Sequence, residues 1–511
     1  MLSSLMGVKA TNPALPLTCN ALIWIVKPHC MAIVWQRDRP MPDTPPLQRL
    51  LDDLRLEREG DTPLYEQLAE YLATRIETGA LSAGTRLPPH RDIASQLDIN
   101  ITTVTRAIAE LKARTLVESR PGRGTRVAAM ESPSTDFQTA PSDSRGVIDL
   151  SVNRPALDLY TETLSATLAT LAEDDRYADI KDYQQPVGPG WARHAYVAWW
   201  QTQGLHLDAE RLTLVDGAQH GLSMILRSVT QPGEIILADS VTYQGINALC
   251  HTLGRELIGV EGDDQGMSPE HLEALCQRHA PRMLFVVPCL HNPTTRTLSR
   301  ARREAIVAIA RRYDVLLIED DVYRPLQQSA PPPLLDLAPE RTFHVSGFSK
   351  CVAPGLRFGA IASPSYYHHD IAAAMRIDCW SSSPLTALIA TRLLESGDMT
   401  RIIHAQHAEL VARHEILIER LGRQALWSQA GATHAWLLLP EPWRGTDFVK
   451  ASAEQGVRLL PASAFTLRQV VPPAAVRINL AAARSREALG EALTRLDLLA
   501  RRGHHYMHDM A

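Results

Sequence analysis

Hydrophobic positions along the chain follow two different periods, and the change between them divides the sequence into parts. Between Pro63 and Gly79 apolar side chains recur three or four positions apart, which predicts an amphipathic helix. Proline suits the first turn of such a helix and glycine suits its C-terminal end. A short helix is predicted after Pro88-Pro89, and a third begins at Asn100, a residue type that caps helix N-termini. The segment therefore predicts three successive helices.

The third predicted helix has a distinct exposed face. Its apolar positions share one side and leave small, hydroxyl and cationic residues on the other: Thr102, Arg106, Ala109 and Ala113. Such a face suits insertion into the major groove of DNA. Two short strands, 116–120 and 125–128, flank Pro121-Gly122-Arg123-Gly124, which predicts a hairpin whose Arg123 lies near DNA phosphates. A small helical interaction domain with a solvated basic face is the alternative for the same pattern.

From Val147 to about Arg502, short apolar runs alternate with amphipathic helices. Four of these runs are mostly apolar, as in strands buried on both faces of a mostly parallel sheet; they span 211–215, 234–238, 283–287 and 315–319. The polar stretch from about 130 to 146, rich in Pro and Ser, is typical of a linker. Because ligands bind at the carboxyl ends of parallel strands, the residues after each run are the candidates for a site.

Chemically reactive or ligand-binding residue types follow each of these runs. A small-residue turn that opens a helix can hold a phosphate on its backbone N–H groups, and a tyrosine ring can stack on a flat cofactor. The segments, in chain order, are Asp216-Gly217-Ala218-Gln219, Tyr243, His291-Asn292-Pro293-Thr294, Asp320-Asp321-Val322-Tyr323, Ser349-Lys350 and Pro354-Gly355-Leu356-Arg357. Each is weak evidence alone, but their order along one α/β domain favours a single site.

The composition indicates in which cellular compartment the protein acts and which binding partners it can have. The chain has 511 residues, 45% of them hydrophobic, which suffices for more than one buried core. The net charge of −5 is small, so DNA binding depends on local cations: Val104–Val127 holds six cationic and two acidic residues. The seven cysteines form no Cys-x-x-Cys pair, which indicates a reducing cytoplasm and no zinc site. No apolar run approaches the roughly 20 residues of a membrane span.

The N-terminal segment resembles the winged-helix domain of GntR-type regulators. The resemblance rests on Gly84-x-Arg86-Leu87-Pro88-Pro89-x-Arg91-Asp92-Ile93-Ala94, on Thr103-Val104-x-Arg106-Ala107 and on Gly122-Arg123-Gly124-Thr125. It departs from the family where Asn100 and Ile101 replace a common Ser-Arg pair, so one contact to DNA is missing. The residues expected to contact double-stranded DNA are Arg91, Thr102, Thr103, Arg106 and Arg123.

The later segments resemble fold-type I pyridoxal-phosphate enzymes of the aminotransferase family, and the whole chain resembles MocR-type regulators. The resemblance implies a Schiff base on Lys350 and a pairing of Asp320 with the pyridinium nitrogen, with Tyr243 covering the ring. Tyr323 and Asn292 would bind the ring's 3-oxygen, and Arg477 a substrate carboxylate. The phosphate would be held by Gly217, Ala218, Gln219, Ser349 and Arg357, and by Tyr183 from a neighbouring subunit of a homodimer. Gly347 occupies a position where a hydroxyl residue is common in the family, so Ser346 or Ser349 is expected to contribute more to phosphate binding.

These resemblances predict a multidomain chain. Residues 59–129 form the winged helix-turn-helix, 130–146 the linker, and 147–505 an α/β fold-type I domain with a smaller C-terminal α+β subdomain. Residues 1–58 are expected to be an extension, either disordered or due to a mis-assigned start, with Met31 or Met41 as the true first residue. An exported protein is not expected, because the apolar block at 21–26 is short.

The function expected is a cytoplasmic, DNA-binding transcription regulator that senses an amino compound or the cofactor. One alternative is a metabolic aminotransferase with a vestigial winged helix, since Lys350, Asp320 and Tyr243 would provide a complete catalytic set. A sensor of the cofactor alone would leave Arg477 without a role.

Overall fold

The computed structural model describes two blocks of the chain. The first comprises residues 50–51, 54–58, 62–77, 80–82, 84–114, 116–120 and 124–128, and the second 146–423, 425–468 and 470–501. The expected linker, apart from Gly146, and Arg123 at the expected hairpin tip lie outside the described residues. Each block is described by itself.

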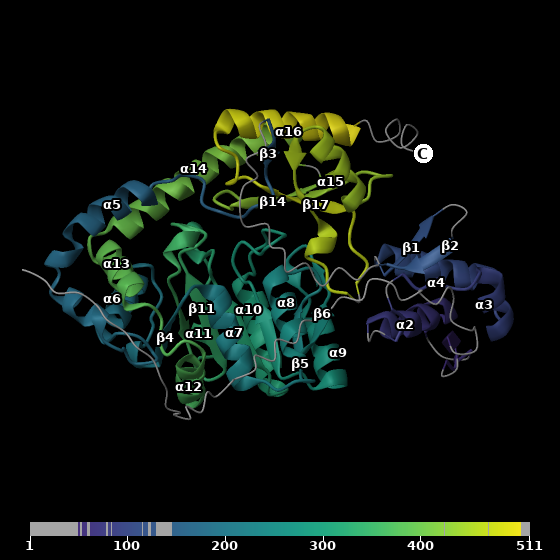
Figure 1. The fold of residues 1–511 in the computed structure, drawn as a ribbon, viewed down its shortest axis with the longest axis horizontal. Coiled ribbons are helices and arrows are strands. Elements are labelled where there is room, and N and C mark those ends of the chain that lie inside the picture. Colours follow the sequence, from purple (N-terminus) through teal and green to yellow (C-terminus); the bar gives the residue numbers. More distant parts are fainter. Residues whose placement is uncertain are drawn as a thin grey trace, which may run out of the picture. The chain divides into compact units, whose positions relative to one another are not determined.

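The first block has the three helices and the hairpin predicted from the periodicity. The helices are α2 (Leu64–Glu77), α3 (His90–Leu97) and α4 (Ile101–Ala113), followed by antiparallel β1 (Val117–Arg120) and β2 (Gly124–Val127) (Figure 1). Asn100 caps α4 as predicted, because its side chain accepts a hydrogen bond of 2.9 Å from the Thr102 N–H. The arrangement is that of a winged helix.

The apolar face of each helix meets the others in one core. Leu68 and Leu72 of α2 pack with Val104 and Leu111 of α4, and all four side chains are fully buried. Leu50 and Leu51 belong to the same core, so this core extends upstream of residue 59, while residues 1–49 of the expected extension lie outside the described residues. The polar residues between Leu51 and Leu64 concealed this contact, because they interrupt the helical spacing.

The second block is built on a seven-stranded sheet in the order β4-β12-β11-β10-β9-β5-β6. Its strands are β4 (Leu212–Val215), β5 (Ile235–Asp239), β6 (Glu256–Val260), β9 (Met283–Val286), β10 (Leu316–Asp320), β11 (Thr342–Gly347) and β12 (Gly359–Ala362). The four predicted runs match β4, β5, β9 and β10. The sheet is parallel from β11 to β6, whereas β12 runs antiparallel to β11 and β4.

Both faces of this sheet are covered by helices, which explains the continuous apolar runs. Successive strand residues enter different cores: Ile236 and Ile318 pack on one face, and Leu237 and Leu317 on the other. The first face is covered by α6 (Gly190–Thr202), α7 (Ala218–Val229), α8 (Gln244–Leu253), α12 (His368–Asp378) and α13 (Pro384–Glu395). The second is covered by α9 (Pro269–His279), α10 (Arg300–Arg312) and α11 (Leu334–Leu337).

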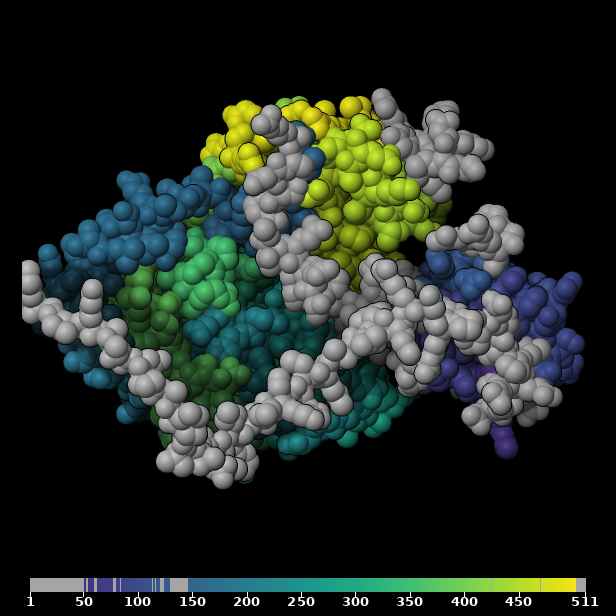
Figure 2. Space-filling model, in the orientation of Figure 1, coloured from purple at the N-terminus to yellow at the C-terminus, as the bar shows by residue number. Residues whose placement is uncertain are grey.

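A smaller α+β lobe follows in the chain, as the sequence predicted, and it is distinct in the space-filling view (Figure 2). Its antiparallel sheet has the order β13 (Leu426–Trp427), β14 (His434–Leu438), β17 (Ala475–Asn479) and β16 (Leu460–Pro461). The lobe also contains α15 (Gly445–Glu454) and α16 (Arg486–Arg501), and α14 (Asp398–Leu421) leads into it. The short β3 (Ile148–Asp149) pairs with β15 (Val457–Arg458), which brings the beginning of the second block to this lobe.

The remaining described elements are short or peripheral. They include α5 (Tyr160–Thr170) and the hairpin of β7 (Gly262–Asp263) with β8 (Gly266–Met267). None of the helices within the described residues is long and apolar enough to cross a membrane.

Candidate functional site

A half-buried lysine lies at the carboxyl edge of the large sheet, where the sequence predicted a site. Lys350 follows β11, and its Nζ donates a hydrogen bond of 3.2 Å to the backbone oxygen of Asn153. The Asn153 amide in turn donates to Tyr323 Oη at 2.7 Å, while its own Oδ1 is buried without a partner among the described residues. Asn153 therefore connects two of the predicted residues, although no sequence motif indicated it.

A second pair of predicted residues meets at the border of the two lobes. Arg477 on β17 donates from Nη1 to Asn292 Oδ1 at 3.0 Å and from Nη2 to the Ser151 oxygen at 2.5 Å. Its guanidinium carbon lies 4.7 Å from the centroid of the Phe465 ring, and its Nε is buried without a partner among the described residues. The arginine is thus fixed in position while part of its hydrogen-bonding capacity is unused, as in a carboxylate-binding site.

The third group surrounds the N-terminus of α7. Gly217 has φ = 84°, a conformation that favours glycine, and a Cβ there would lie 2.8 Å from the Arg357 guanidinium. Arg357 donates to the Asp216 backbone oxygen at 2.5 Å, and its side chain is exposed. Free backbone N–H groups of a helix start beside a guanidinium make a cradle for an anion. Ala218 is the first residue of α7, and Ser349 is half-buried.

Tyr243 is linked to the same helix. Its hydroxyl donates to Gln219 Oε1 at 3.0 Å, and the Gln219 amide donates to the Gly245 oxygen at 3.2 Å. Gln219 thereby fixes Tyr243 rather than offering its own side chain to an anion. The expected contribution of Ser346 is wrong, because strand alternation turns its hydroxyl into the core, 2.6 Å from Tyr196 Oη.

Tyr183 lies apart from this cluster. Its side chain is 88% exposed, and its ring centroid is 5.1 Å from that of Trp380. No hydrogen bond, ion pair or ring contact joins Tyr183 to Lys350 or Arg357 among the described residues.

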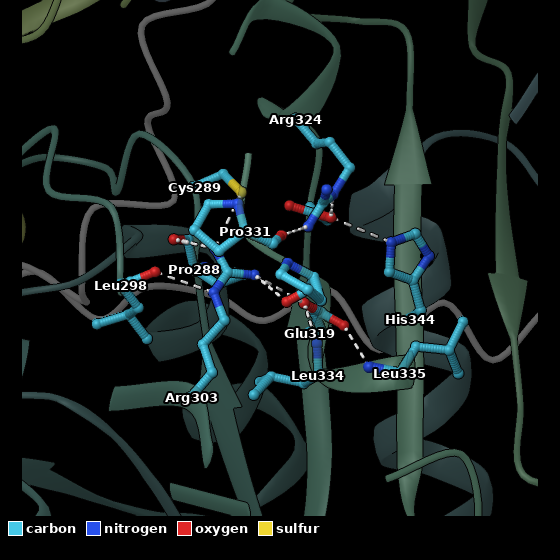
Figure 3. Close-up of polar contacts among 12 residues, drawn as sticks. Pro288, Cys289, Leu298, Arg303, Glu319, Arg324, Pro331, Leu334, Leu335 and His344 are labelled. Carbon is cyan, nitrogen blue, oxygen red and sulfur yellow. Dashed lines mark hydrogen bonds and ion pairs between the residues drawn. The ribbon is translucent and has the colours of Figure 1, made fainter. Parts of the chain in front are cut away.

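Three consecutive acids, Glu319, Asp320 and Asp321, are buried at the end of β10, and the first and the third have close partners. Figure 3 shows Glu319 with Arg303, Leu334 and Leu335. Glu319 accepts from the N–H groups of Leu334 and Leu335 at 2.8 and 2.9 Å and lies 3.8 Å from Arg303. Asp321 pairs with Arg324, and its Oδ2 lies 3.3 Å from His344 Nε2. Asp320 has only a long contact of 3.5 Å from the Val322 N–H among the described residues.

The ionisation of these groups follows their surroundings. Burial opposes ionisation of Asp321, but Arg324 and His344 hold its pKa well below the usual range. Burial raises the pKa of the Asp320 carboxyl to about 7, and the adjacent charge of Asp321 adds to this shift. Burial also lowers the pKa of the Lys350 ammonium to about 8, assisted by the Arg477 cation. Both groups therefore titrate near neutral pH, which is common at functional sites.

Four of the five predicted DNA-contacting residues lie on α3 and α4 of the winged helix, and the fifth, Arg123, lies outside the described residues. Arg106 is exposed, and its guanidinium carbon lies 4.1 Å from the centroid of the Tyr65 ring, a cation–π contact that orients it. Arg91 is 81% exposed, beside Asp92 at 3.3 Å. Thr102 is exposed, but its hydroxyl donates to the Asn100 side chain at 2.9 Å; Thr103 is half-buried.

Comparison with known proteins agrees with both blocks. The family described as "Aminotransferase class I and II" matches residues 145–496, and "Bacterial regulatory proteins, gntR family" matches residues 64–127. The chain therefore belongs to the class I and II aminotransferase family. It carries in addition a gntR-type region in front of that domain.

Relatives share this combined length. The chain is 27% identical over 435 residues to the HTH-type transcriptional regulator YdeF of Bacillus subtilis, covering 85% of this chain and 94% of that protein. It is 27% identical over 394 residues to the HTH-type pyridoxine biosynthesis transcriptional regulator PdxR of Corynebacterium glutamicum. The match covers 75% of this chain and 84% of that protein.

Solved structures resemble the second block. The kynurenine aminotransferase of Pyrococcus horikoshii has a TM-score of 0.65 at 21% identity, covering 70% of this chain and 92% of that one. An archaeal alanine:glyoxylate aminotransferase has a TM-score of 0.65 at 21% identity. The match covers 73% of this chain and 94% of that chain. This likeness shows the fold of the fold-type I aminotransferases.

The unpartnered carboxyl of Asp320 predicts a pH-dependent effect of Asp320→Asn in protein prepared without cofactor. A carboxyl whose pKa is raised in the folded state binds a proton more tightly there than in the unfolded chain, so folding stability falls as pH rises from the unfolded pKa toward 7. The asparagine variant does not carry this loss. The free energy of unfolding of the variant, relative to that of the parent, should therefore rise by roughly 2–3 kcal/mol between pH 5 and pH 8.

Denaturant unfolding of both proteins at the two pH values measures this difference. Asp263→Asn, at a carboxyl that Arg302 pairs at 2.8 Å, is the control and should show no such gain. An equal stability difference at pH 5 and pH 8 for the Asp320 variant would mean that this carboxyl is not held in an unfavourable environment.

Proposed function

We propose that the protein is a DNA-binding transcription regulator whose aminotransferase-like domain binds pyridoxal phosphate and senses an amino compound. One observation supports this above all others: a single chain contains a helix face that suits a DNA groove and a half-buried lysine surrounded by the residues of a cofactor-binding set. The regulators YdeF and PdxR, which the chain resembles over most of its length, support the same function. A regulator of this kind acts in the cytoplasm, where the DNA is.

The residues present fit pyridoxal phosphate. Asp320 is a buried acid with no cationic hydrogen-bond partner among the described residues, as a protonated ring nitrogen would require. The Gly217 turn, the start of α7 and Arg357 form a cradle for the phosphate, in which a Cβ at Gly217 would collide with the guanidinium. In this proposal Lys350 holds the cofactor covalently, Tyr323 and Asn292 hydrogen-bond its 3-oxygen, and Tyr243 covers the ring.

The cofactor, when bound, supplies an electron-withdrawing ring that weakens bonds at the Cα of an attached amino compound. Lys350 is suited to moving a proton there, because its lowered pKa leaves Nζ partly neutral near pH 8. Asp320 keeps the ring nitrogen protonated, and Tyr323 is oriented by the Asn153 amide. Arg477 binds the carboxylate of the amino compound and is itself positioned by Asn292.

The assembly we propose is a homodimer through the large domain, with Tyr183 reaching the phosphate of the neighbouring subunit. Its side chain is 88% exposed and lies beside Trp380, so it is accessible to a neighbouring subunit. Two winged helices in one dimer would bind two half-sites on DNA. We also propose that residues 130–146 separate the two parts as a linker.

The covalent attachment predicts that the purified holoprotein contains one borohydride-reducible link, at Lys350. Lys350→Ala should lose this link and retain weaker cofactor binding through the phosphate cradle. Peptide mapping after reduction identifies the modified residue. A link at any other lysine would contradict the site proposed here.

The dimer predicts that Tyr183→Ala weakens cofactor binding, although Tyr183 makes no hydrogen bond or ring contact with Lys350 among the described residues. Titration with pyridoxal phosphate, combined with sedimentation at micromolar concentration, measures both properties. Tyr177→Ala, at another exposed tyrosine, is the control. A stable monomer with full cofactor occupancy would rule the dimer out.

The regulatory function predicts that Arg106→Ala weakens operator binding by roughly 1–3 kcal/mol while leaving the cofactor spectrum unchanged, if the guanidinium binds a guanine edge. Lys112→Ala, in the last turn of the same helix, is the control for a general loss of positive charge and should affect specific and scrambled DNA alike. Gel shifts on the protein's own upstream region, with and without pyridoxal phosphate and amino acids, measure both. A parent protein that binds no DNA would favour an aminotransferase instead.

A further inference from the structure

A cavity of about 140 Å³ lies beside the candidate site, and none of the roles proposed above uses it. Its walls come from the ends of β5 and β9 in the large domain and from β13 and β14 in the small lobe. The residues that characterise it are Asp239, Ser240, His291, Arg296, Trp427 and Trp436.

One end of the cavity is acidic. Asp239 is the last residue of β5, and its Oδ2 lies 3.6 Å from Nε2 of His291. The imidazole is oriented by Thr294, whose hydroxyl lies 2.8 Å from Nδ1, while Nε2 is buried and has no hydrogen-bond partner among the described residues. The His291 side chain is only 8% exposed. Because buried polar atoms are nearly always paired, this unpaired nitrogen in the cavity wall indicates a missing ligand group.

The other charged group of the cavity is a cation. The Arg296 guanidinium lies 3.7 Å from the centroid of the Trp427 ring, and partial burial lowers its pKa. No hydrogen bond joins this guanidinium to another described residue. Its planar N–H groups therefore remain available to a carboxylate.

We infer that this cavity binds a small zwitterionic amino compound, with its ammonium group at Asp239 and its carboxylate at Arg296. A dianion would place a second negative charge beside the Asp239 carboxylate, which would repel it. An amine without a carboxylate would leave the Arg296 cation unpaired. The two tryptophan rings favour a compound whose carbon skeleton is short and apolar. No lysine among the described residues lines the cavity, so binding there is non-covalent and distinct from binding at Lys350.

The cavity shares a wall with the proposed carboxylate-binding arginine. His291 precedes Asn292, which accepts from Arg477, and Trp436 lies opposite Arg477 in the β14–β17 register. Phe465 contacts both, with 6.1 Å between its ring centroid and that of Trp436 and 4.7 Å to the Arg477 guanidinium. A ligand in the cavity is thereby placed to change the affinity of the cofactor site for amino compounds.

The test uses N,N-dimethylglycine, a zwitterion whose tertiary ammonium retains one N–H but cannot condense with the cofactor aldehyde. Calorimetric titration of the full-length holoprotein should show saturable binding of one molecule per chain. Asp239→Asn and Arg296→Gln should each weaken this binding by roughly tenfold or more, since each removes a charge partner. Asp263→Asn is the matched control, because this carboxylate also acts on Arg296 but does not line the cavity.

The outcomes separate this inference from the proposed function. Loss of binding in Arg477→Gln but not in Asp239→Asn would place the probe in the cofactor site and overturn the inference. Absence of saturable binding up to about 50 mM, far above a Kd of 1 mM, would also overturn it. An unchanged cofactor spectrum and melting temperature show that each variant is folded. Gel shifts report DNA binding independently, so failure here leaves the regulator proposal intact.

Discussion

The burial of three consecutive carboxyl groups at the end of β10 is the constraint on which the candidate site depends. A buried carboxylate is costly unless charged groups and hydrogen bonds compensate it. Arg303 and the first N–H groups of α11 compensate Glu319, and Arg324 and His344 compensate Asp321. These contacts join β10 to α10, α11 and β11, and Lys350 follows β11. The middle acid, Asp320, is thus held rigidly with its own charge uncompensated, which is the arrangement a cationic ring nitrogen would complete.

The rest of the site is assembled from segments far apart in the chain. Residues 151–153 run between the lobes, where the Ser151 oxygen accepts from Arg477 and the Asn153 oxygen accepts from Lys350. One short segment therefore contacts both the lysine of the large domain and the arginine of the small lobe. Since Arg477 is also bound to Asn292, any movement of the small lobe changes the surroundings of the site, which gives a regulator a physical route for a response to its ligand.

The sequence predicted the elements whose signals are local. The runs that became β4, β5, β9 and β10 are mostly apolar because both sheet faces are covered, and polar residues follow them because strand ends face the site. Asn100 was found as a cap because capping depends on the next few residues. The reversed direction of β12 was not anticipated, because strand direction depends on pairing and leaves no mark on the apolar pattern.

Residues that act through distant partners were missed for the same reason. Asn153 contacts Tyr323 across 170 positions, and nothing near it in the chain marks it. The contact of Arg106 with Tyr65 and the burial of Leu50 and Leu51 likewise arise only when the helices pack. The wrong expectation for Ser346 came from its position near the lysine, whereas strand alternation directs its side chain to Tyr196.

The proposed site depends most on the pairing of Asp320 with the ring nitrogen of pyridoxal phosphate. Its most direct test compares the affinity of the protein for pyridoxal phosphate and for the analogue in which carbon replaces that nitrogen, in the parent and in Asp320→Asn. If Asp320 pairs directly with the ring nitrogen, the parent should prefer the natural cofactor by roughly tenfold or more. The Asp320→Asn variant should lose most of this preference, because the two changes then remove the same interaction in a double-mutant cycle. Equal affinity of the parent for both compounds would contradict this pairing.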